Sequence, residues 1–183
     1  MSKLLQDDTI LLRALEPEDL DILYEWENDT DLWKYGSSLS PFSRFALRQY
    51  LVYAQQDIYQ TKQLRLMIVL RENNQRIGTV DLYDFDPFHG RAGVGILLDT
   101  KYRNQGYGSK SLELLEEYAF NFLKLHQLYA FIPEQNIASI RLFKKVGFQH
   151  TATLKEWVSL QHTYVDVIVM QKFNTKKIDK FYA

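Results

Sequence analysis

The fold is decided by one stretch of this chain, Gly95-Ile96-Leu97-Leu98-Asp99-Thr100-Lys101-Tyr102-Arg103-Asn104-Gln105-Gly106-Tyr107-Gly108-Ser109. Its pattern predicts a buried strand, a short basic loop with two glycines, and the start of a long amphipathic helix. Backbone amides and positive charge at a helix N-terminus bind phosphate, and glycine reaches positive φ with no side chain to keep the ligand away. The stretch therefore predicts a phosphate-bearing small molecule as ligand, and its alternative is an ordinary strand-to-helix turn.

Composition limits the function classes. The chain has 183 residues, 46% of them hydrophobic and 14% aromatic, which indicates one globular domain with a full core. A net charge of −1 gives no general attraction to nucleic acid. Zero cysteines exclude disulfides and thiolate zinc sites, and the histidines share no metal-ligand spacing, so we expect no metal. Acid near the start and the lack of a long apolar run predict a cytoplasmic protein without a membrane partner.

Charge is uneven along the chain. Residues 14–33 contain no Lys or Arg and carry eight acids: Glu16, Glu18, Asp19, Asp21, Glu25, Glu27, Asp29 and Asp31. One interpretation is a solvated helix face, since acids near a helix start also suit its dipole. The other is a negative surface that attracts a cationic substrate. Sequence alone leaves both open.

Hydrophobic periodicity predicts the order of the elements. We expect strands at 9–13, 63–71, 76–85, 91–98, 127–132, 148–158 and 163–172, and helices that begin at 16, 42, 109 and 136. The helix at 109–125 has an inward stripe made of Leu112, Leu115, Ala119 and Phe122. Asn136 suits the N-cap of the last helix, and Gly147 suits the position after its end. The pattern predicts an α+β fold with a mixed sheet flanked by helices.

Three segments resemble one known family. Arg103-Asn104-Gln105-Gly106-Tyr107-Gly108 resembles the loop with which GNAT-superfamily N-acetyltransferases hold the pyrophosphate of acetyl-CoA. The segment from Asn136 to Phe148, and the start Leu11-Leu12-Arg13-Ala14-Leu15-Glu16-Pro17-Glu18-Asp19-Leu20, are similar to further segments of that superfamily. The pattern is most similar to the branch with the spermidine/spermine and ribosomal-protein N-terminal acetyltransferases. The resemblance implies the GNAT fold with a mostly antiparallel sheet in one domain, 1–183, with its core at about 9–172 and a basic tail at 173–183.

The resemblance also implies an acetyl-CoA site. Backbone groups of Ile96, Leu97 and Leu98 would bind the pantetheine arm. The pyrophosphate would lie in the loop formed by Arg103, Asn104, Gln105, Gly106, Tyr107, Gly108 and Ser109. Asn136 would contact the pantetheine arm, Phe143 would lie near the thioester end, and Lys144 or Lys145 would pair with a CoA phosphate. For both lysines the alternative is a solvated position on the helix surface.

Two positions depart from the family pattern. Asn104 stands where many relatives carry glycine, but asparagine is one of the few other residues that tolerate left-handed geometry. Phe143 stands where relatives usually carry a tyrosine that returns a proton to the departing CoA thiolate. Phenylalanine keeps the packing and loses the hydroxyl. Water or another tyrosine, with Tyr129 and Tyr164 as candidates, then supplies the proton, or turnover is slow.

Acetyl transfer to an amine sets further requirements. An aliphatic amine is mostly protonated at pH 7, so a carboxylate must accept its proton, directly or through water. Asp81 is our preferred base because it lies among the hydrophobic residues of a predicted strand. Asp84 and Glu27 are the next candidates. The alternative for Asp81 is a structural one, an acid on the solvent-exposed face of its strand. A backbone N–H near 96–98, such as that of Leu97, would bind the thioester oxygen as charge develops on it.

The sequence therefore leads to one preferred function and two alternatives. The preferred function is acetyl-CoA-dependent acetylation of a small polyamine such as spermidine or spermine, which the acidic segment 14–33 supports. The first alternative is another acceptor, either a protein N-terminus or an amino sugar or antibiotic. The second, motivated by Phe143, is a catalytically weak acyl-CoA-binding module. Relatives often form dimers or larger rings, so the resemblance also implies a homo-oligomer.

Overall fold

A computed structural model describes residues 4–33, 40–160 and 163–175, so most of the predicted basic tail (176–183) lies outside the described residues. Its centre is a seven-stranded sheet in the order β1-β2-β3-β4-β5-β7-β6. The strands are β1 (Ile10–Ala14), β2 (Leu64–Leu70), β3 (Arg76–Asp86), β4 (Arg91–Leu98), β5 (Gln127–Pro133), β6 (Gln149–Leu160) and β7 (Thr163–Phe173). Only β4 and β5 pair in parallel, so the mixed, mostly antiparallel sheet predicted from the sequence is confirmed.

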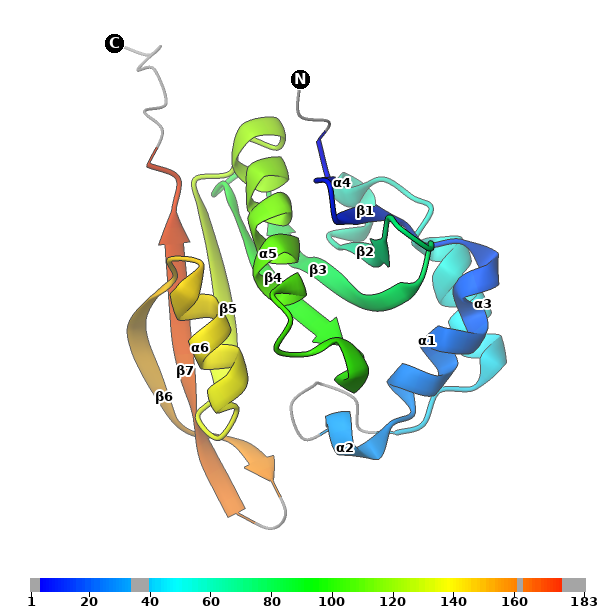
Figure 1. The fold of residues 1–183 in the computed structure, drawn as a ribbon. Coiled ribbons are helices and arrows are strands. Elements are labelled where there is room, and N and C mark those ends of the chain that lie inside the picture. Colours follow the sequence, from blue (N-terminus) through cyan, green and yellow to red (C-terminus); the bar gives the residue numbers. More distant parts are fainter. Residues whose placement is uncertain (1–3, 34–39, 161–162, 176–183) are drawn as a thin grey trace.

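Helices cover both faces of the sheet (Figure 1). One face carries α5 (Tyr107–Glu117) and α6 (Ile137–Lys145), which pack against each other. The other carries α1 (Leu20–Glu27) and α3 (Arg44–Tyr53), and the short α2 (Thr30–Trp33) contacts α1. A further short helix, α4 (Ile58–Thr61), follows α3, and its Ile58 joins the core on the α5 face. Neither short helix is predicted from the hydrophobic periodicity. None of the helices among the described residues is long and apolar enough to cross a membrane.

Two apolar clusters form the core, one on each face of the sheet. Alternation along β2 separates them, because successive side chains of a strand point to opposite faces. Leu66 and Ile68 join the cluster under α5, whereas Met67 and Val69 join the cluster under α1 and α3. The α5 cluster is the larger one, and it includes Leu112 and Leu115 from the predicted inward stripe.

The predicted stripe is wrong at its last position. Leu112, Leu115 and Ala119 are fully buried, but Phe122 is 62% exposed. The α-helix ends at Glu117 and continues as a π-helical segment, Tyr118–Phe122. A π-turn holds more residues than an α-turn, so side chains beyond it no longer follow the α-helical spacing. This change of spacing accounts for the outward position of Phe122.

The parallel pairing between β4 and β5 is short. It joins Arg91 to Gln127, Ala92 to Leu128 and Gly93 to Tyr129, and then it stops. On its other side β4 stays paired with β3 as far as Leu98. Figure 1 shows β4 and β5 diverging beyond their paired ends, near the start of α5. Within the described chain, residues 94–98 therefore lack a strand partner on the β5 side.

Candidate active site

The glycine loop leads into α5 through two left-handed residues. Asn104 has φ 61° and Gly106, the N-cap of α5, has φ 87°. The prediction that Asn104 tolerates left-handed geometry is therefore confirmed. An ideal Cβ at Gly106 would meet no atom of the described chain within 4 Å, so its surroundings are open. The amides of the first helical residues, Tyr107, Gly108 and Ser109, have no acceptor within the helix, as at every helix start.

Gly108 serves packing instead of backbone geometry. It is buried, and a Cβ there would lie 3.1 Å from Leu142 of α6 and 3.3 Å from Leu98 of β4. These contacts bring the first turn of α5 against the end of β4 and against α6. The loop thus needs glycine at 106 for its left-handed backbone and glycine at 108 for close packing.

Side chains of the loop brace its backbone. The Nε of Arg103 donates a hydrogen bond to the Leu98 carbonyl at 3.0 Å, and the amide of Gln105 donates to the Lys101 carbonyl at 2.8 Å. Both residues are exposed. The Arg103 bond ties the loop to the end of β4, so the guanidinium lies beside the unpaired section of that strand.

The other predicted cofactor residues lie on β4 and at the start of α6. Ile96 and Leu98 pack against the α5 core, whereas Leu97 packs on the opposite face of the sheet. The Asn136 side chain caps α6 by accepting a hydrogen bond from the Ser139 amide at 3.1 Å, which confirms the predicted N-cap. Its NH₂ group takes no part in this capping bond.

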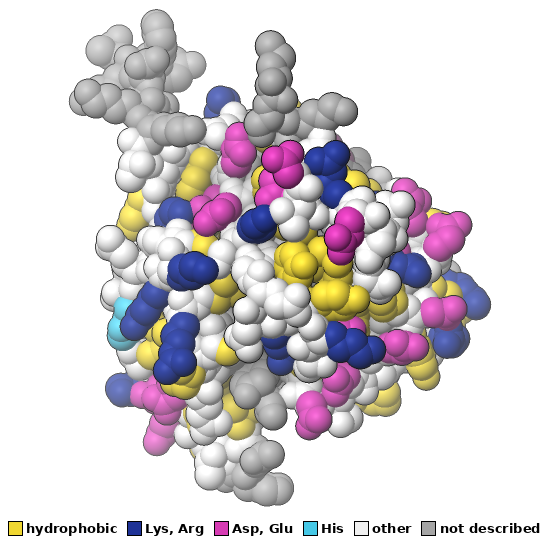
Figure 2. All heavy atoms as spheres, viewed as in Figure 1, with side chains coloured by type: hydrophobic (Ala, Val, Ile, Leu, Met, Phe, Trp, Pro, Cys, Tyr) yellow, Lys and Arg dark blue, Asp and Glu magenta, His cyan; other side chains and the backbone are white. Residues whose placement is uncertain are grey.

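Phe143 and Lys145 lie in contrasting places on α6. Phe143 is 2% exposed and packs edge-on against Phe148 with ring centres 5.0 Å apart, so its ring belongs to the core. Lys145 is exposed in the last turn, three residues beyond Leu142. Figure 2 shows Lys and Arg side chains gathered over α6, where Arg141, Lys144 and Lys145 are exposed. The start of α5 therefore has a basic neighbour.

The predicted acids Asp81 and Glu27 meet at one arginine. Asp81 of β3 is 8% exposed and accepts from Arg65 Nε at 2.6 Å and from Arg65 Nη2 at 3.3 Å. Glu27, the last residue of α1, accepts from Arg65 Nη1 at 2.6 Å. Asp81 is therefore paired and buried, which contradicts the alternative of a wet strand face. Sequence reasoning missed Arg65, although an arginine in the apolar strand 63–71 was a signal.

Asp84 lies apart from that pair. It is exposed and adopts φ 48°, within the irregular pairing between β3 and β4. The register between β3 and β4 shifts between Tyr83 and Asp86, so Asp84 does not take part in the regular pairing that contains Asp81 and Tyr83.

Tyrosines gather where the β4–β5 pairing ends. The Tyr83 ring covers Gly93, where a Cβ would lie 2.2 Å from a ring carbon, and its centre is 6.0 Å from that of Tyr129. Burial raises the pKa of Tyr83 above its usual range and also raises that of Tyr129. Tyr164, in contrast, is 69% exposed on β7. Tyr129 and Tyr164 are the tyrosines predicted from the sequence; Tyr83 is a further one, and its place over Gly93 depends on the register of β3 and β4.

The acidic segment 14–33 divides into paired and exposed acids. Asp19 is completely buried and bound by Arg13 and Arg76; Glu27 binds Arg65, and Asp21 pairs with Arg44. The exposed remainder consists of Glu16, Glu18, Glu25, Asp29 and Asp31. Neither sequence interpretation therefore holds for the whole segment, because the buried acid Asp19 supports the fold.

Comparison with known proteins connects this geometry to a family. The acetyltransferase (GNAT) domain family model matches residues 9–149. The chain is 25% identical to spermidine N(1)-acetyltransferase of Escherichia coli K12, over 88% of this chain and 84% of that one. It is 27% identical to the uncharacterized N-acetyltransferase p20 of Bacillus licheniformis, over 89% and 92%.

Solved structures show the same fold. Spermidine N-acetyltransferase from Vibrio cholerae, in complex with CoA and spermine, superposes with a TM-score of 0.83 at 22% identity, over 91% of this chain and 96% of that one. The dodecameric form of the same enzyme in an intermediate state superposes with a TM-score of 0.78 at 22% identity, over 96% and 99%. With the family match over most of its length, the chain belongs to the GNAT acetyltransferase family.

Proposed function

We propose that this acetyltransferase takes its acetyl group from acetyl-CoA and transfers it to a primary amine of a polyamine such as spermidine or spermine. The observation that carries the proposal is the loop 103–109, where two left-handed residues lead into the exposed start of α5 beside the unpaired edge of β4. A helix start of this kind favours a diphosphate. The similar V. cholerae enzyme, solved with CoA and spermine, supports both the donor and the acceptor class.

In this proposal the donor extends along β4 from the loop. The amides of residues 103–109 hold the diphosphate, and Lys145 pairs with a phosphate at the neighbouring end of α6. Backbone groups of Ile96, Leu97 and Leu98, which β5 leaves unpaired, bind the pantetheine arm together with the Asn136 amide. Phe143 contributes packing beneath the thioester end, consistent with its buried ring.

The transfer step requires a base and a proton for sulfur. The amine nitrogen forms a bond to the acetyl carbon, the C–S bond breaks, and its electron pair goes to sulfur. Asp81 or Glu27 accepts the proton that leaves nitrogen, with Asp84 as a third candidate. The Leu97 amide binds the oxygen on which charge develops. Because Phe143 has no hydroxyl, water or a tyrosine such as Tyr129 or Tyr164 gives a proton to the thiolate.

The acceptor panel is the decisive experiment. Release of free thiol from acetyl-CoA is followed with spermidine, spermine, a peptide with a free N-terminus and an amino sugar, and CoA binding is measured by calorimetry. Saturable release with the polyamines is the expected result. Release with the peptide alone would replace the polyamine by a protein N-terminus. CoA binding without release would indicate a binding module, and the absence of CoA binding by folded protein would end the proposal.

We also propose that the chain assembles into a homo-oligomer, as the dodecameric V. cholerae relative does. Light scattering on the purified protein tests this point independently of activity. A monomer at micromolar concentration would contradict it.

A further inference from the structure

Arg65 joins two acids that are far apart in the sequence. It lies on β2, and its guanidinium contacts Glu27 of α1 at 2.6 Å and Asp81 of β3 at 2.6 and 3.3 Å. Every contact is a charge-assisted hydrogen bond, and the bond pair to Asp81 uses both carboxylate oxygens. One arginine therefore fixes the position of two of the three acids proposed as base.

The cluster is shielded from solvent and carries a net negative charge. The side chains of Arg65, Glu27 and Asp81 are 21%, 18% and 12% exposed. One guanidinium and two carboxylates have a net charge of −1, so a bound ammonium group would bring the net charge of the cluster to zero. Partial burial strengthens each of these interactions relative to bulk water.

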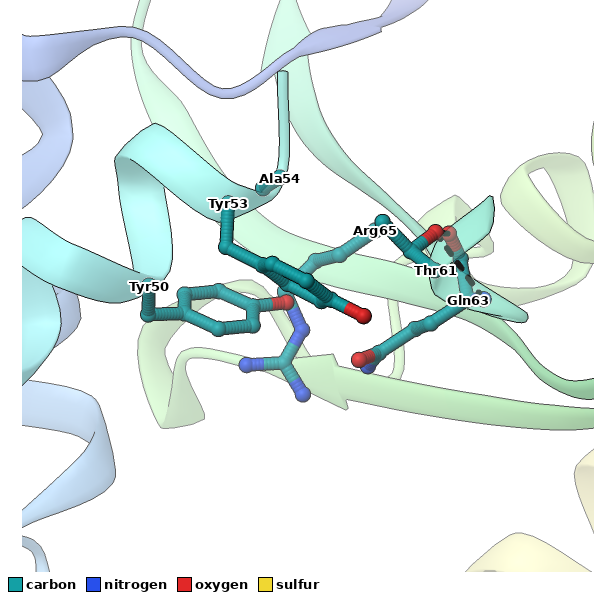
Figure 3. A pocket seen from close by; sticks show the side chains of 6 residues that line it. All are labelled: Tyr50, Tyr53, Ala54, Thr61, Gln63 and Arg65. Carbon is teal, nitrogen blue, oxygen red and sulfur yellow. Dashed lines mark hydrogen bonds between the residues drawn. The ribbon is translucent and has the colours of Figure 1, made fainter. Parts of the chain in front are cut away.

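Aromatic side chains complete the surroundings of Arg65. The guanidinium lies 5.4 Å from the ring centre of Tyr50, and Figure 3 shows Tyr50 and Tyr53 of α3 beside Arg65, with Gln63 across the shallow pocket that they line. Burial raises the pKa of Tyr50 to about 12, so its phenol stays neutral. Arg65 is thus held on several sides, and a rigid guanidinium makes a precise support for its carboxylates.

The cluster borders the section of β4 where the proposed reaction would occur. Asp81 pairs with Gly95 in the β3–β4 register, and a Cβ at Gly95 would lie 3.6 Å from Asp81 Oδ2. Because glycine leaves that space free, the carboxylate faces the backbone of β4 directly. Gly95 lies just beyond Gly93, where the pairing of β4 with β5 ends.

We infer that Arg65 is a positioning residue for acetyl transfer, which holds Asp81 and Glu27 as one unit beside β4 so that the incoming amine meets a fixed carboxylate. This inference rests on the proposed function. Arg65 itself takes no proton, and it acts through the orientation of the two acids. Displacement of a reacting group by about 1 Å can lower a rate by about a hundredfold, so loss of the fork would lower turnover more than donor binding.

Arg13 provides a matched control. It also forms a two-bond pair with a buried aspartate, Asp19, at 2.7 and 2.9 Å, and its side chain is 29% exposed. Arg13 lies on β1, at the far end of the sheet from the β4–β5 junction. Arg65→Lys and Arg13→Lys each keep the charge and lose the planar fork.

The experiment compares kcat and KM for spermidine and for acetyl-CoA, together with thermal unfolding, in the wild type and both variants. We expect Arg65→Lys to lower kcat by about ten- to a hundredfold with KM for acetyl-CoA within about twofold, because the donor contacts other residues. We expect Arg13→Lys to lower the melting temperature similarly and to leave kcat near the wild-type value. Equal kcat changes in the two variants would overturn the inference.

A second variant covers the case in which Arg65→Lys does not fold. Glu27→Gln keeps an oxygen acceptor for Arg65 and removes the charge, and it should lower kcat with acetyl-CoA binding unchanged. Where Arg65→Lys does fold and the acids act as one unit, the effects of Glu27→Gln and Arg65→Lys on the free energy of activation combine to less than their sum. If the wild type is active, the inference is contradicted by a double variant whose effects are additive, or by a Glu27→Gln variant whose kcat is unchanged. A wild type that is inactive with every amine overturns both this inference and the proposed function.

Discussion

The loop 103–109 and the acidic segment 14–33 belong to opposite faces of the sheet and depend on different physics. The loop is held by local contacts: Arg103 binds Leu98 and Gln105 binds Lys101, each within five residues. The acids of 14–33 also bind residues far along the chain: Glu27 binds Arg65, and Asp19 binds Arg76 in addition to the nearby Arg13. The loop backbone is thus braced by neighbouring residues, with Gly108 packed against Leu142 of α6, whereas the acidic segment depends on the folded sheet.

This difference determines what a substitution does in each region. In the loop a change acts on backbone geometry and on the groups presented to a ligand. In the acidic segment the effect of a change depends on whether the acid is buried, because the segment contains a completely buried Asp19 and the strongly exposed Asp21.

Asp19→Ala should have the largest effect on stability. Its buried carboxylate accepts hydrogen bonds from Arg13, Arg76 and the Glu16 amide, all of which lose their acceptor in the variant. Removing one partner of a buried ion pair costs about 3–5 kcal/mol, and we expect about 3 kcal/mol because the arginines are partly exposed. Urea denaturation measures the change. Asp21→Ala, at a side chain that is 77% exposed, should leave the free energy of unfolding nearly unchanged. Equal losses of stability in the two variants would contradict the distinction between buried and exposed acids.

The same carboxylate should make stability depend on pH. Burial alone would raise the pKa of Asp19, but hydrogen bonds from Arg13 and the Glu16 amide outweigh it, so the folded-state pKa is lowered. A lowered folded pKa stabilises the protein above the unfolded value, about 3.9, and this stability is lost as pH falls through the folded pKa. The stability gap between wild type and Asp19→Asn should therefore narrow from about pH 6 to about pH 2. A constant gap over that range, in denaturation at fixed ionic strength, would contradict this assignment.

Gly106→Ala should have a smaller effect that arises from the backbone. Gly106 has φ 87° with open space around its Cβ position, so no clash accompanies the substitution. A left-handed conformation costs other residues about 1–2 kcal/mol, and we expect about 1 kcal/mol from denaturation. Gly106→Asn should lose less, because asparagine tolerates this region. If Ala and Asn behave alike, left-handed geometry is not what the position requires.

Hydrophobic periodicity and helix-capping residues predict most of the fold from the sequence. The strand 91–98, the Asn136 cap and the glycine at 147 follow from periodicity and capping, and the structure confirms each of them. Phe122 was misplaced because nothing in the spacing of apolar residues predicts a π-turn, which depends on how the end of the helix packs.

The sequence predicts less of the candidate site than of the fold. Asp81 and Glu27 were named separately, but their shared partner Arg65 depends on β2 and β3 lying side by side with α1 above them. The Tyr83 ring over Gly93 likewise depends on the register between two strands. Such contacts are set by tertiary structure, so the residues could be proposed from sequence and their association could not.

Asn104→Gly should have the smallest effect and tests the loop most closely. Asn104 has φ 61°, a value that glycine adopts freely, so glycine removes any residual backbone strain. Glycine also gives the unfolded chain more freedom, which opposes that gain. We expect the two effects nearly to cancel, with a change below about 0.5 kcal/mol in denaturation and CoA affinity within about twofold. Asn104→Ala should lose about 1 kcal/mol, because alanine has neither the freedom of glycine nor the tolerance of asparagine. If alanine is instead as stable as asparagine, the loop does not need a left-handed residue at 104, and its geometry must come from Gly106 and the Arg103 bond to Leu98.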